Sequence, residues 1–521
     1  MIPRLITKPE QSGKTFVMLK EMIKLLECEK PFDIKNINIV LCDNNLMLVL
    51  QTLNRFGNNN LLKNHIELSS SKRASTHNYQ EVVYKIINNN IRNILCCSNY
   101  VRLNDLVSII ETIYKLGVYS FYQFHIWIDE ADKWLNGIDK YIIPVIEKYG
   151  NIKLNLITAT PKKIIQNYGE VEILPLQNST LPEYHSWLDG EFKIYPDVYS
   201  TTNFVEYILT NNSKEIKPGT KWFIPSNIKK ETHLLVKEYC KKKGFATIII
   251  NGEGIKVYLP NGSIIKRDRY EMPDRLISRI YQELDLEKYP LAITGYLCIS
   301  RGITISSPNF QITHAIMPAG MKNHQEISQI AGRIKGNQKL WNSYKKPKIY
   351  VTNKLFLIAS TIESKTKFLS ENAFLTGKIF INIDDYICAD KPFIYYQHKK
   401  KFKTYEESIY YLKTQEHNLK PNDSQKTIIN VEKLLTKKCI ERRGNFNDTH
   451  WVSRILNTKK TIQNGEAQFY TQFILDKMPI YKTIAEPNNT KYKSYVIIPI
   501  YKTYTSQPED VLFVVRHTKW K

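Results

Sequence analysis

A lysine and a hydroxyl residue lie where the sequence predicts a turn from a strand into a helix, a place that can bind phosphate. The strand is predicted over Pro3–Thr7 and the helix over Thr15–Cys28. Backbone N–H groups at such a helix start attract anions, Lys14 can reach the β- and γ-phosphates of a nucleotide, and the hydroxyl of Thr15 can bind Mg²⁺. The candidate nucleotide-binding residues of this loop are Gln11, Ser12, Gly13, Lys14 and Thr15.

The phosphate-binding loop is degenerate. Residues 9–15 read P-E-Q-S-G-K-T, and Lys8 stands where the full pattern has a glycine. Taken alone, S-G-K-T also fits the solvated start of an ordinary helix. The loop therefore needs support from a second element.

An acidic cluster ends a second predicted strand. Residues 125–132 read H-I-W-I-D-E-A-D. Acidic residues at the carboxyl end of a parallel strand lie at the ligand-binding edge of an α/β sheet. There Asp129 can hold Mg²⁺, and Glu130 can orient and deprotonate an attacking water. The alternative is that Asp129–Asp132 only caps the next helix, which the phosphate-binding loop upstream makes less favoured.

Two blocks of alternating strands and helices position these residues, and the first is a doubly wound α/β domain. Its predicted strands are Pro3–Thr7, Ile37–Cys42, Ile94–Ser98, His125–Asp129 and Leu154–Thr158. The second block spans about residues 217–358. Its predicted elements are the strands Lys221–Pro225, Phe245–Asn251, Pro290–Thr294 and Ile312–Met317 and the helix Ile228–Lys243, capped by Ser226 and ended by Gly244.

Composition bounds the class of protein. The 521 residues include 74 Lys and Arg against 50 Asp and Glu, a formal net charge of +24, which attracts polyanions. Nucleic acid is the first partner expected, although a biased genome composition also explains Lys-rich sequence. The sequence shows no secretory leader or long apolar run and no zinc spacing among its eight cysteines. We expect a soluble, intracellular protein with free thiols and no membrane association, and the sequence identifies no protein partner.

Five motifs in order resemble those of superfamily 2 helicases. They are the phosphate-binding loop at 9–15, D-E-A-D at Asp129–Asp132, T-A-T-P at Thr158–Pro161, T-G-Y-L-C-I-S-R-G-I-T at Thr294–Thr304, and Q-I-A-G-R-I-K-G at Gln329–Gly336. The resemblance covers roughly residues 5–340. It implies two tandem RecA-like parallel-sheet domains with ATP and Mg²⁺ between them, and DNA or RNA, as a single strand or a fork, as the partner.

The last motif has a plain physical rationale. An arginine from the second domain stabilises charge on the departing γ-phosphoryl group, and Arg333 is the candidate. Gln329, four residues earlier on the same helical face, would help to place the water. The resemblance also implies a nucleotide contact at Gly302. Residues implied to couple the ATP and nucleic-acid sites are Asp132, Thr158, Thr160, Thr294 and Arg301.

Several departures separate the chain from DEAD-box proteins. Gln11 replaces a glycine of the helicase loop, Gly336 after Lys335 replaces a second arginine, and Thr304 replaces an aspartate. The third motif reads T-A-T rather than S-A-T, and the chain begins too close to the loop for an upstream glutamine motif. Hydrolysis would rest on Arg333 with assistance from Lys335. We interpret the chain as a divergent member, similar to helicases of large DNA viruses and mobile elements, and favour DNA slightly.

The expected organisation is a RecA-like domain over 1–165, a linker over 166–212, a second RecA-like domain over 213–365 and a basic accessory region over 366–521. Its densest basic run, His398–Lys403, has rings nearby at Tyr395, Tyr396 and Phe402 and suggests a second nucleic-acid contact; a solvated or structural face is the alternative. The candidate cations are Lys399, Lys400, Lys401 and Lys403. Two rival functions remain open: a binding module without turnover, and an ATPase or kinase for small molecules.

Overall fold

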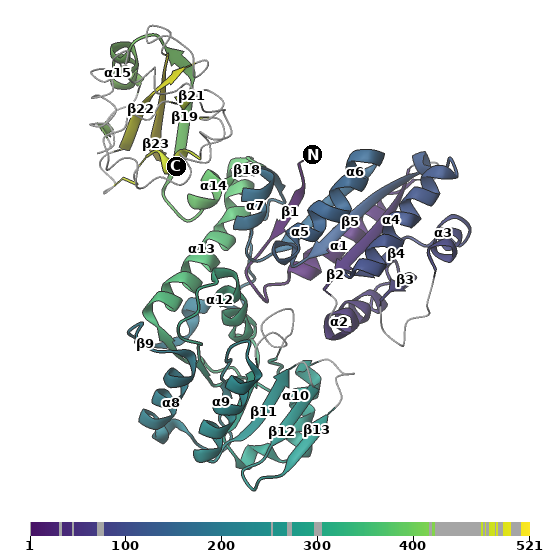
Figure 1. The fold of residues 1–521 in the computed structure, drawn as a ribbon, viewed down its shortest axis with the longest axis vertical. Coiled ribbons are helices and arrows are strands. Elements are labelled where there is room, and N and C mark those ends of the chain that lie inside the picture. The colour runs from purple at the N-terminus through teal and green to yellow at the C-terminus, as the bar shows by residue number, and fades with distance from the viewer. Residues whose placement is uncertain are drawn as a thin grey trace, which may run out of the picture. The chain divides into compact units, whose positions relative to one another are not determined.

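The computed structural model divides into two compact units, Met1–Phe380 and Ile381–Lys521, which are described separately (Figure 1). Among the residues that the structure describes, no helix combines the length and the apolar character needed to cross a bilayer. The residues that the structure describes are 2–30, 34–43, 46–69, 78–251, 254–267, 273–295, 305–415, 419–421, 470–471, 475, 479–484, 486–487, 493–501 and 512–520.

The first sheet of the first unit is parallel along the strand order β7-β1-β6-β5-β2-β4-β3. Its strands are apolar because helices cover both faces, as in β2, where Val40 and Leu41 are buried. The strands are β1 (Arg4–Thr7), β2 (Lys35–Cys42), β3 (His65–Leu68), β4 (Asn93–Cys97), β5 (Tyr122–Asp129), β6 (Ile152–Thr158) and β7 (Glu170–Ile173).

Helices follow these strands, and two begin at asparagine caps. The side chain of Asn78 accepts from the N–H of Glu81, and that of Asn99 accepts from the N–H of Arg102, satisfying donors that have no partner within the helix. The helices are α1 (Lys14–Glu27), α2 (Leu46–Gly57), α3 (Tyr79–Asn88), α4 (Tyr100–Lys115), α5 (Leu135–Gly137), α6 (Ile143–Tyr149) and α7 (Lys162–Tyr168).

The second sheet has the order β13-β12-β11-β14-β10-β15-β17-β9. It is parallel except at one edge, where β11, β12 and β13 run antiparallel. The strands are β9 (Glu191–Tyr195), β10 (Lys221–Phe223), β11 (Ala246–Asn251), β12 (Gly254–Tyr258), β13 (Ile264–Arg267), β14 (Leu291–Gly295), β15 (His314–Ile316) and β17 (Lys348–Thr352). The prediction of two tandem RecA-like parallel-sheet domains is confirmed.

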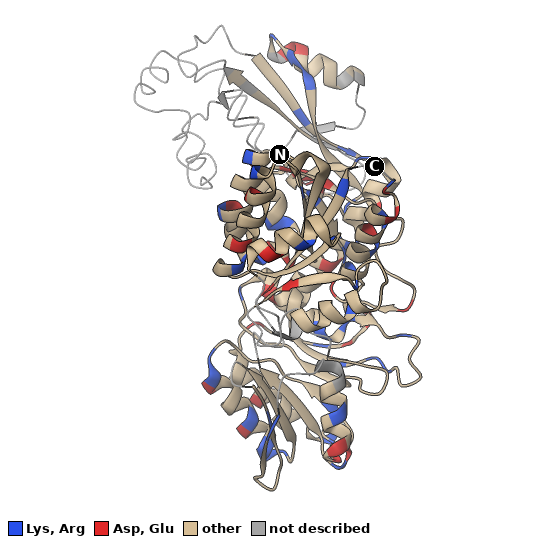
Figure 2. Cartoon of the chain, turned by 90° about the vertical axis from the view of Figure 1, so that its right-hand side faces the viewer, with Lys and Arg blue, Asp and Glu red and all other residues tan. Residues whose placement is uncertain are grey.

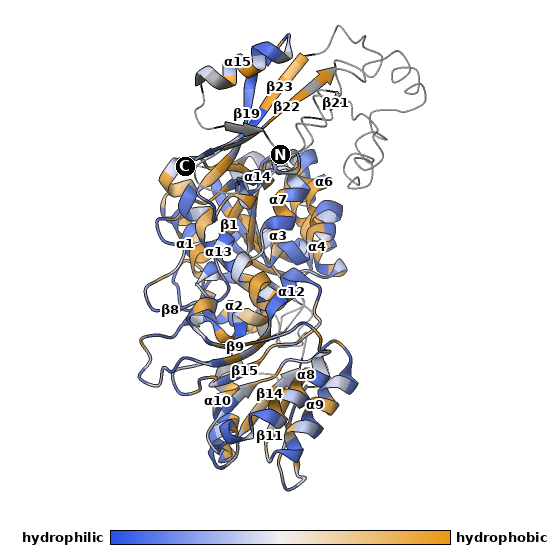
Figure 3. Cartoon of the chain, turned by 90° about the vertical axis from the view of Figure 1, so that its left-hand side faces the viewer, coloured by the Kyte–Doolittle hydropathy of each residue, from blue (hydrophilic) through white to orange (hydrophobic). Residues whose placement is uncertain are grey.

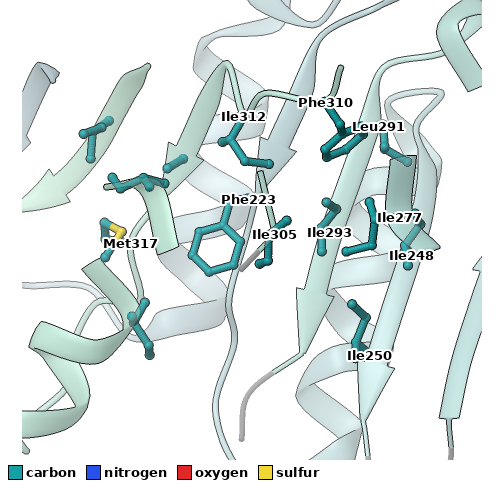
Figure 4. Close-up of a cluster of buried hydrophobic side chains, with 14 of the residues drawn as sticks. Phe223, Ile248, Ile250, Ile277, Leu291, Ile293, Ile305, Phe310, Ile312 and Met317 are labelled. Carbon is teal, nitrogen blue, oxygen red and sulfur yellow. The ribbon is translucent and has the colours of Figure 1, made fainter. Parts of the chain in front are cut away.

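Helices α8 (Thr201–Asn211), α9 (Lys230–Lys242), α10 (Pro273–Glu283), α12 (His324–Ala331) and α13 (Asn353–Thr376) surround the second sheet. Figure 4 shows part of the core beneath them, where Phe223, Ile293 and Ile305 are fully or almost fully buried. The predicted cap of α9 is wrong, because the helix begins at Lys230 and Lys229 takes the cap position. The buried hydroxyl of Ser226 instead lies 3.2 Å from that of Thr232.

The segments between the predicted domains carry more structure than the sequence pattern indicates. Within 166–212, β7 joins the first sheet, β9 joins the second beside β17, and β8 (Tyr184–His185) pairs with β16 (Gly336–Asn337). Helix α13 continues from the second sheet across residue 365 without a break. Strands β7, β8 and β9 are short and lack the long apolar runs by which central strands are recognised in sequence.

The second unit contains a small mixed sheet that the sequence rhythm did not predict. Strands β19, β23 and β22 are antiparallel, and β20 and β21 pair parallel to β22. β22 and β23 are mostly apolar (Figure 3). The elements are β18 (Phe380–Asn382) at the boundary, α14 (Ile383–Ile387), β19 (Phe393–Phe402), α15 (Tyr405–Gln415), β20 (Leu419–Pro421), β21 (Tyr470–Thr471), β22 (Lys493–Tyr501) and β23 (Leu512–Trp520).

Candidate nucleotide-binding site

The loop after β1 turns through two left-handed residues before α1 begins. Gly13 precedes the helix with φ 92°, a conformation that favours glycine, and Gln11 adopts φ 58°. A left-handed glutamine costs about 1 kcal/mol, and such residues cluster at functional sites. The hydroxyl of Ser12 donates to the carbonyl of Pro9 over 2.6 Å, which closes the loop internally. Lys14 then opens the helix at the place predicted for a phosphate ligand.

A cavity of about 640 Å³ adjoins this loop. It gathers residues that are far apart in sequence, from the elements around both sheets of the first unit. Lys14, Thr15, Asp129 and Glu130 come from the part built on the first sheet. Gln329 and Arg333 come from the part built on the second. Gln11 and Gly13 also line the cavity, whereas Ser12, between them in the loop, is buried and does not.

The acidic pair lies at the end of β5, as its spacing predicts. The carboxylate of Asp129 accepts the backbone N–H of Glu130 over 3.0 Å, and Glu130 is left-handed with φ 53°. Burial and the charge of Glu130 raise the pKa of Asp129 to about 6, although Lys14 and Arg55 oppose the shift. Because the chain turns at Glu130, both carboxylates border the same cavity.

Gln329 and Arg333 reach the cavity from α12 and the turn after it. The helix ends at Ala331, so Arg333 lies on a following 3-10 turn rather than on the same helix. The Nε2 of Gln329 donates to Glu130 Oε2 over 2.8 Å, and the Nε of Arg333 donates to the carbonyl of Gln329 over 3.2 Å. These bonds place an amide and a guanidinium from the second sheet opposite the acidic pair of the first.

The last acid of D-E-A-D binds the T-A-T segment. Asp132 is buried, and its two carboxylate oxygens accept from the hydroxyls of Thr158 over 2.7 Å and Thr160 over 2.8 Å. The carbonyl of Ala159 accepts from the hydroxyl of Thr366, on α13, over 2.9 Å. The strand end that carries Asp129 and the T-A-T segment are thus joined by fully paired buried polar groups, which hold a fixed geometry.

Lys335 does not lie beside Arg333 in the cavity, where it was expected to assist hydrolysis, but pairs with two carboxylates. Its ammonium is fully buried and lies 2.8 Å from a carboxylate oxygen of Glu10 and 2.6 Å from one of Glu363. It does not line the cavity. Because two carboxylates hold it, this cation is not directed at a bound phosphate.

Sequence spacing missed several residues of the cavity wall. The helix α2 and the loop after it contribute polar side chains, and Glu10 and Asp43 also line the cavity. No motif marks these positions, since their placement depends on how α2 packs beside α1. The polar residues in question are Gln51, Thr52, Arg55, Asn58 and Asn59.

No protein family and no curated protein matches this sequence. Solved structures do. One is "Mss116p (NTE and C-tail double deletion) bound to ssRNA and AMP-PNP", with 17% identity and a TM-score of 0.41 over 67% of this chain and 66% of that chain. Others are the DEAD-box helicase Mss116 bound to ssRNA and UDP-BeF, with 16% identity and a TM-score of 0.42 over 91% and 86%, and RecG bound to a three-way DNA junction, with 14% and 0.37 over 70% and 42%.

The likeness in fold is to helicases. Of the residues taken from the helicase motifs, Arg301 and Gly302 lie outside the described residues, and Thr294 is buried in β14 away from the cavity wall.

The basic run of the second unit forms part of β19. Lys399, Lys400 and Lys401 are exposed, and the register of β19 with β23 shifts between Gln397 and Lys401. The expectation of three rings for base stacking is corrected: Tyr395 and Phe402 are buried in the cores of this sheet because inward and outward residues alternate along a strand. Tyr396 is partly exposed and remains available, as does Lys403 beyond the strand.

Proposed function

We propose that the chain is an ATP-dependent motor that couples ATP hydrolysis to strand separation or to movement along DNA or RNA. The observation that carries this proposal is the single cavity that brings Lys14 and Thr15, Asp129 and Glu130, and Arg333 together. Phosphoryl transfer from ATP to water needs these groups: a lysine for the phosphates, oxygen ligands for a metal, a group that orients water, and an arginine for the developing charge.

Thr15 and Asp129 fit a magnesium ion. A hydroxyl and a carboxylate are hard oxygen ligands, and both border the cavity beside Lys14. When bound with the nucleotide, Mg²⁺ would neutralise charge on the β- and γ-phosphates. Lys14, as the first residue of α1, supplies a second cation at a helix start whose N–H groups also attract anions.

Glu130, Gln329 and Arg333 would carry out the hydrolytic step. The carboxylate of Glu130 accepts a hydrogen bond from the amide of Gln329, so the two groups converge on one point where water can be held. Glu130 would take a proton from that water. Arg333 borders the same cavity and would stabilise the charge that develops on the γ-phosphoryl oxygens.

Nucleic acid is the proposed partner because the chain carries 24 more Lys and Arg than Asp and Glu. Figure 2 shows basic residues spread over many elements rather than confined to one helix. Binding through phosphates would be nearly independent of sequence and strongly dependent on salt. Asp132, Thr158 and Thr160 would couple the ATP site to this partner, together with Thr294 and Arg301. We favour DNA slightly on the sequence departures from DEAD-box proteins.

The second unit is proposed to add a nucleic-acid contact. Its cations Lys399, Lys400 and Lys401 are exposed on β19 and lie close to Lys403 in sequence. Exposed lysines can approach phosphates at little cost in lost burial, although the ammonium of Lys400 also lies 5.2 Å from the centre of the Phe402 ring. One partly exposed ring, Tyr396, is available for stacking on a base.

The deciding experiment measures ATPase activity with a panel of single-stranded, duplex and forked DNA and RNA, with the Lys14→Ala variant as the control for contaminating ATPases. ATPase activity that nucleic acid stimulates in the parent protein but not in Lys14→Ala supports the motor. Turnover that is indifferent to every nucleic acid indicates an enzyme for small molecules. Nucleic-acid binding without turnover indicates a binding module that shares the fold.

A further inference from the structure

A buried ionic cluster joins the phosphate-binding loop to the segment that carries Arg333. Glu10, in the loop, is only 2% exposed. Its carboxylate accepts from the ammonium of Lys335 over 2.8 Å and from the hydroxyl of Ser328. Its backbone carbonyl accepts from the hydroxyl of Tyr184 over 2.8 Å. The loop residue is therefore held from both its side chain and its main chain by groups outside the first sheet.

The cluster extends to a second carboxylate. Glu363, on α13, lies 2.6 Å from the ammonium of Lys335 and accepts the backbone N–H of Trp187 at both oxygens. Burial alone would lower the pKa of Lys335, but the charges of Glu10 and Glu363 raise it. Burial alone would raise the pKa of Glu10, but the charges of Lys335 and Lys14 lower it. Both groups are thus charged at neutral pH, and their pairing requires a fixed geometry.

Close packing surrounds the same contact. A Cβ added at Gly332 would lie 2.6 Å from the Cβ of Glu10, so the residue directly before Arg333 touches the loop. Gly336 has φ 136° and would place a Cβ 3.4 Å from that of Gln11. A side chain at Gly332 would push the loop away, and one at Gly336 would strain the backbone because of its positive φ.

These contacts explain why two departures occur together. In the loop, Gln11 stands in place of a glycine, directly after Glu10; in the last motif, Gly336 stands in place of a second arginine, directly after Lys335. Glu10 pairs with Lys335, and Gln11 lies against Gly336. Each departure on one side of the cavity thus meets its complement on the other.

We propose that Glu10 and Lys335 are positioning residues that hold the phosphate-binding loop against the turn that carries Arg333. This inference rests on the proposed ATPase function for its catalytic consequence, but the contact itself is independent of turnover. Gln329 and Arg333 border the same cavity as Lys14 and Glu130, so the cluster fixes how the two pairs of side chains face each other.

The first test is hydrogen–deuterium exchange of the nucleotide-free protein. Lys335→Met and Glu10→Gln should speed amide exchange in residues 10–15 and 328–336, with an unchanged pattern in the strands of both sheets. Glu10→Gln keeps the size of the side chain and serves if Lys335→Met does not fold. The matched control is Lys339→Met, which removes a partly exposed ion pair with Asp189 in the same segment. Exchange equal to that of the parent in a folded Glu10→Gln variant would overturn the proposal.

The second test is a double-mutant cycle in ATP turnover. Lys335→Met should lower kcat on the order of 10²-fold, as loss of alignment does, while ATP affinity changes much less. Because Lys335 acts through Arg333, adding Arg333→Ala to Lys335→Met should lower kcat far less than Arg333→Ala does alone. Full additivity contradicts a positioning role. If the parent has no ATPase activity, the proposed function fails, and the exchange experiment still decides on the cluster.

Discussion

The two sides of the cavity are built differently. The first side presents Lys14 from the first turn of α1, after the loop that follows β1, and Asp129 from the last position of β5. The second side presents Gln329 and Arg333 from a helix and a 3-10 turn that hold each other through one bond. The first side is fixed by a parallel sheet and the second by contacts across the cavity. Substitutions on the first side should therefore change binding and chemistry alone. The effect of substitutions on the second side should also depend on the contacts across the cavity.

The largest effect is expected at Glu130, on the first side. Glu130→Gln should bind ATP with nearly the affinity of the parent but lose almost all hydrolysis, because an amide can hold water and cannot take its proton. Fluorescent-nucleotide titration measures the binding, and single-turnover assays measure the chemistry. Hydrolysis at the parent rate would show that another group activates the water.

Arg333, on the second side, should rank next. Arg333→Ala should lower turnover on the order of 10³-fold with little change in ATP affinity, because its charge matters most as the γ-phosphoryl group leaves. Arg333→Lys should recover part of the rate, since a point charge lacks the planar fork of the guanidinium. A loss confined to ATP affinity would place Arg333 among ordinary binding residues.

A smaller effect is expected behind the first side, at Asp132. Asp132→Asn keeps the size of the side chain but removes the acceptor for one of the two threonine hydroxyls. Basal ATPase should fall only a few-fold, and stimulation by nucleic acid should fall more, because the T-A-T segment is no longer held to the end of β5. The ratio of stimulated to basal rates is the measurement; an unchanged ratio would assign Asp132 a purely structural part.

The smallest effect on turnover is expected in the second unit. Replacing Lys399, Lys400, Lys401 and Lys403 together by Ala should leave basal ATPase unchanged and weaken nucleic-acid binding. The slope of log affinity against log salt concentration should fall by the equivalent of up to about four phosphate contacts. Titrations at several salt concentrations measure both. Unchanged affinity and slope in a folded variant would remove the second unit from the nucleic-acid path.

Strand ends explain what the sequence could predict about this site. Lys14 and Asp129 follow apolar strands, so their approach to one edge of a sheet follows from the pattern alone. Glu10 could not be recognised, because its role depends on Lys335 and Ser328, more than 300 residues away along the chain. The wall from α2 was missed for a related reason: it reflects the packing of α2 beside α1, which no spacing encodes.

The fold was predictable to a similar depth. Central strands such as β5 are long and apolar, and the sequence places them well. Strands β7 and β9 are short and partly exposed, and they join different sheets although the sequence suggested one irregular segment. The sheet of the second unit depends on pairing between β19 and β23, far apart in the chain, for which local pattern offers no signal.

Helix α13 sets the mechanics of any opening of the cavity. It leaves β17 of the second sheet and, within one unbroken helix, donates from Thr366 to Ala159 and from Ser370 to the carbonyl of Thr7 in the first sheet. A continuous helix is stiff and does not stretch. Helix α13 thus joins the two sheets through one stiff element. A rotation about Thr366 and Ser370 would move a residue of the cavity wall further the greater its distance from these two bonds.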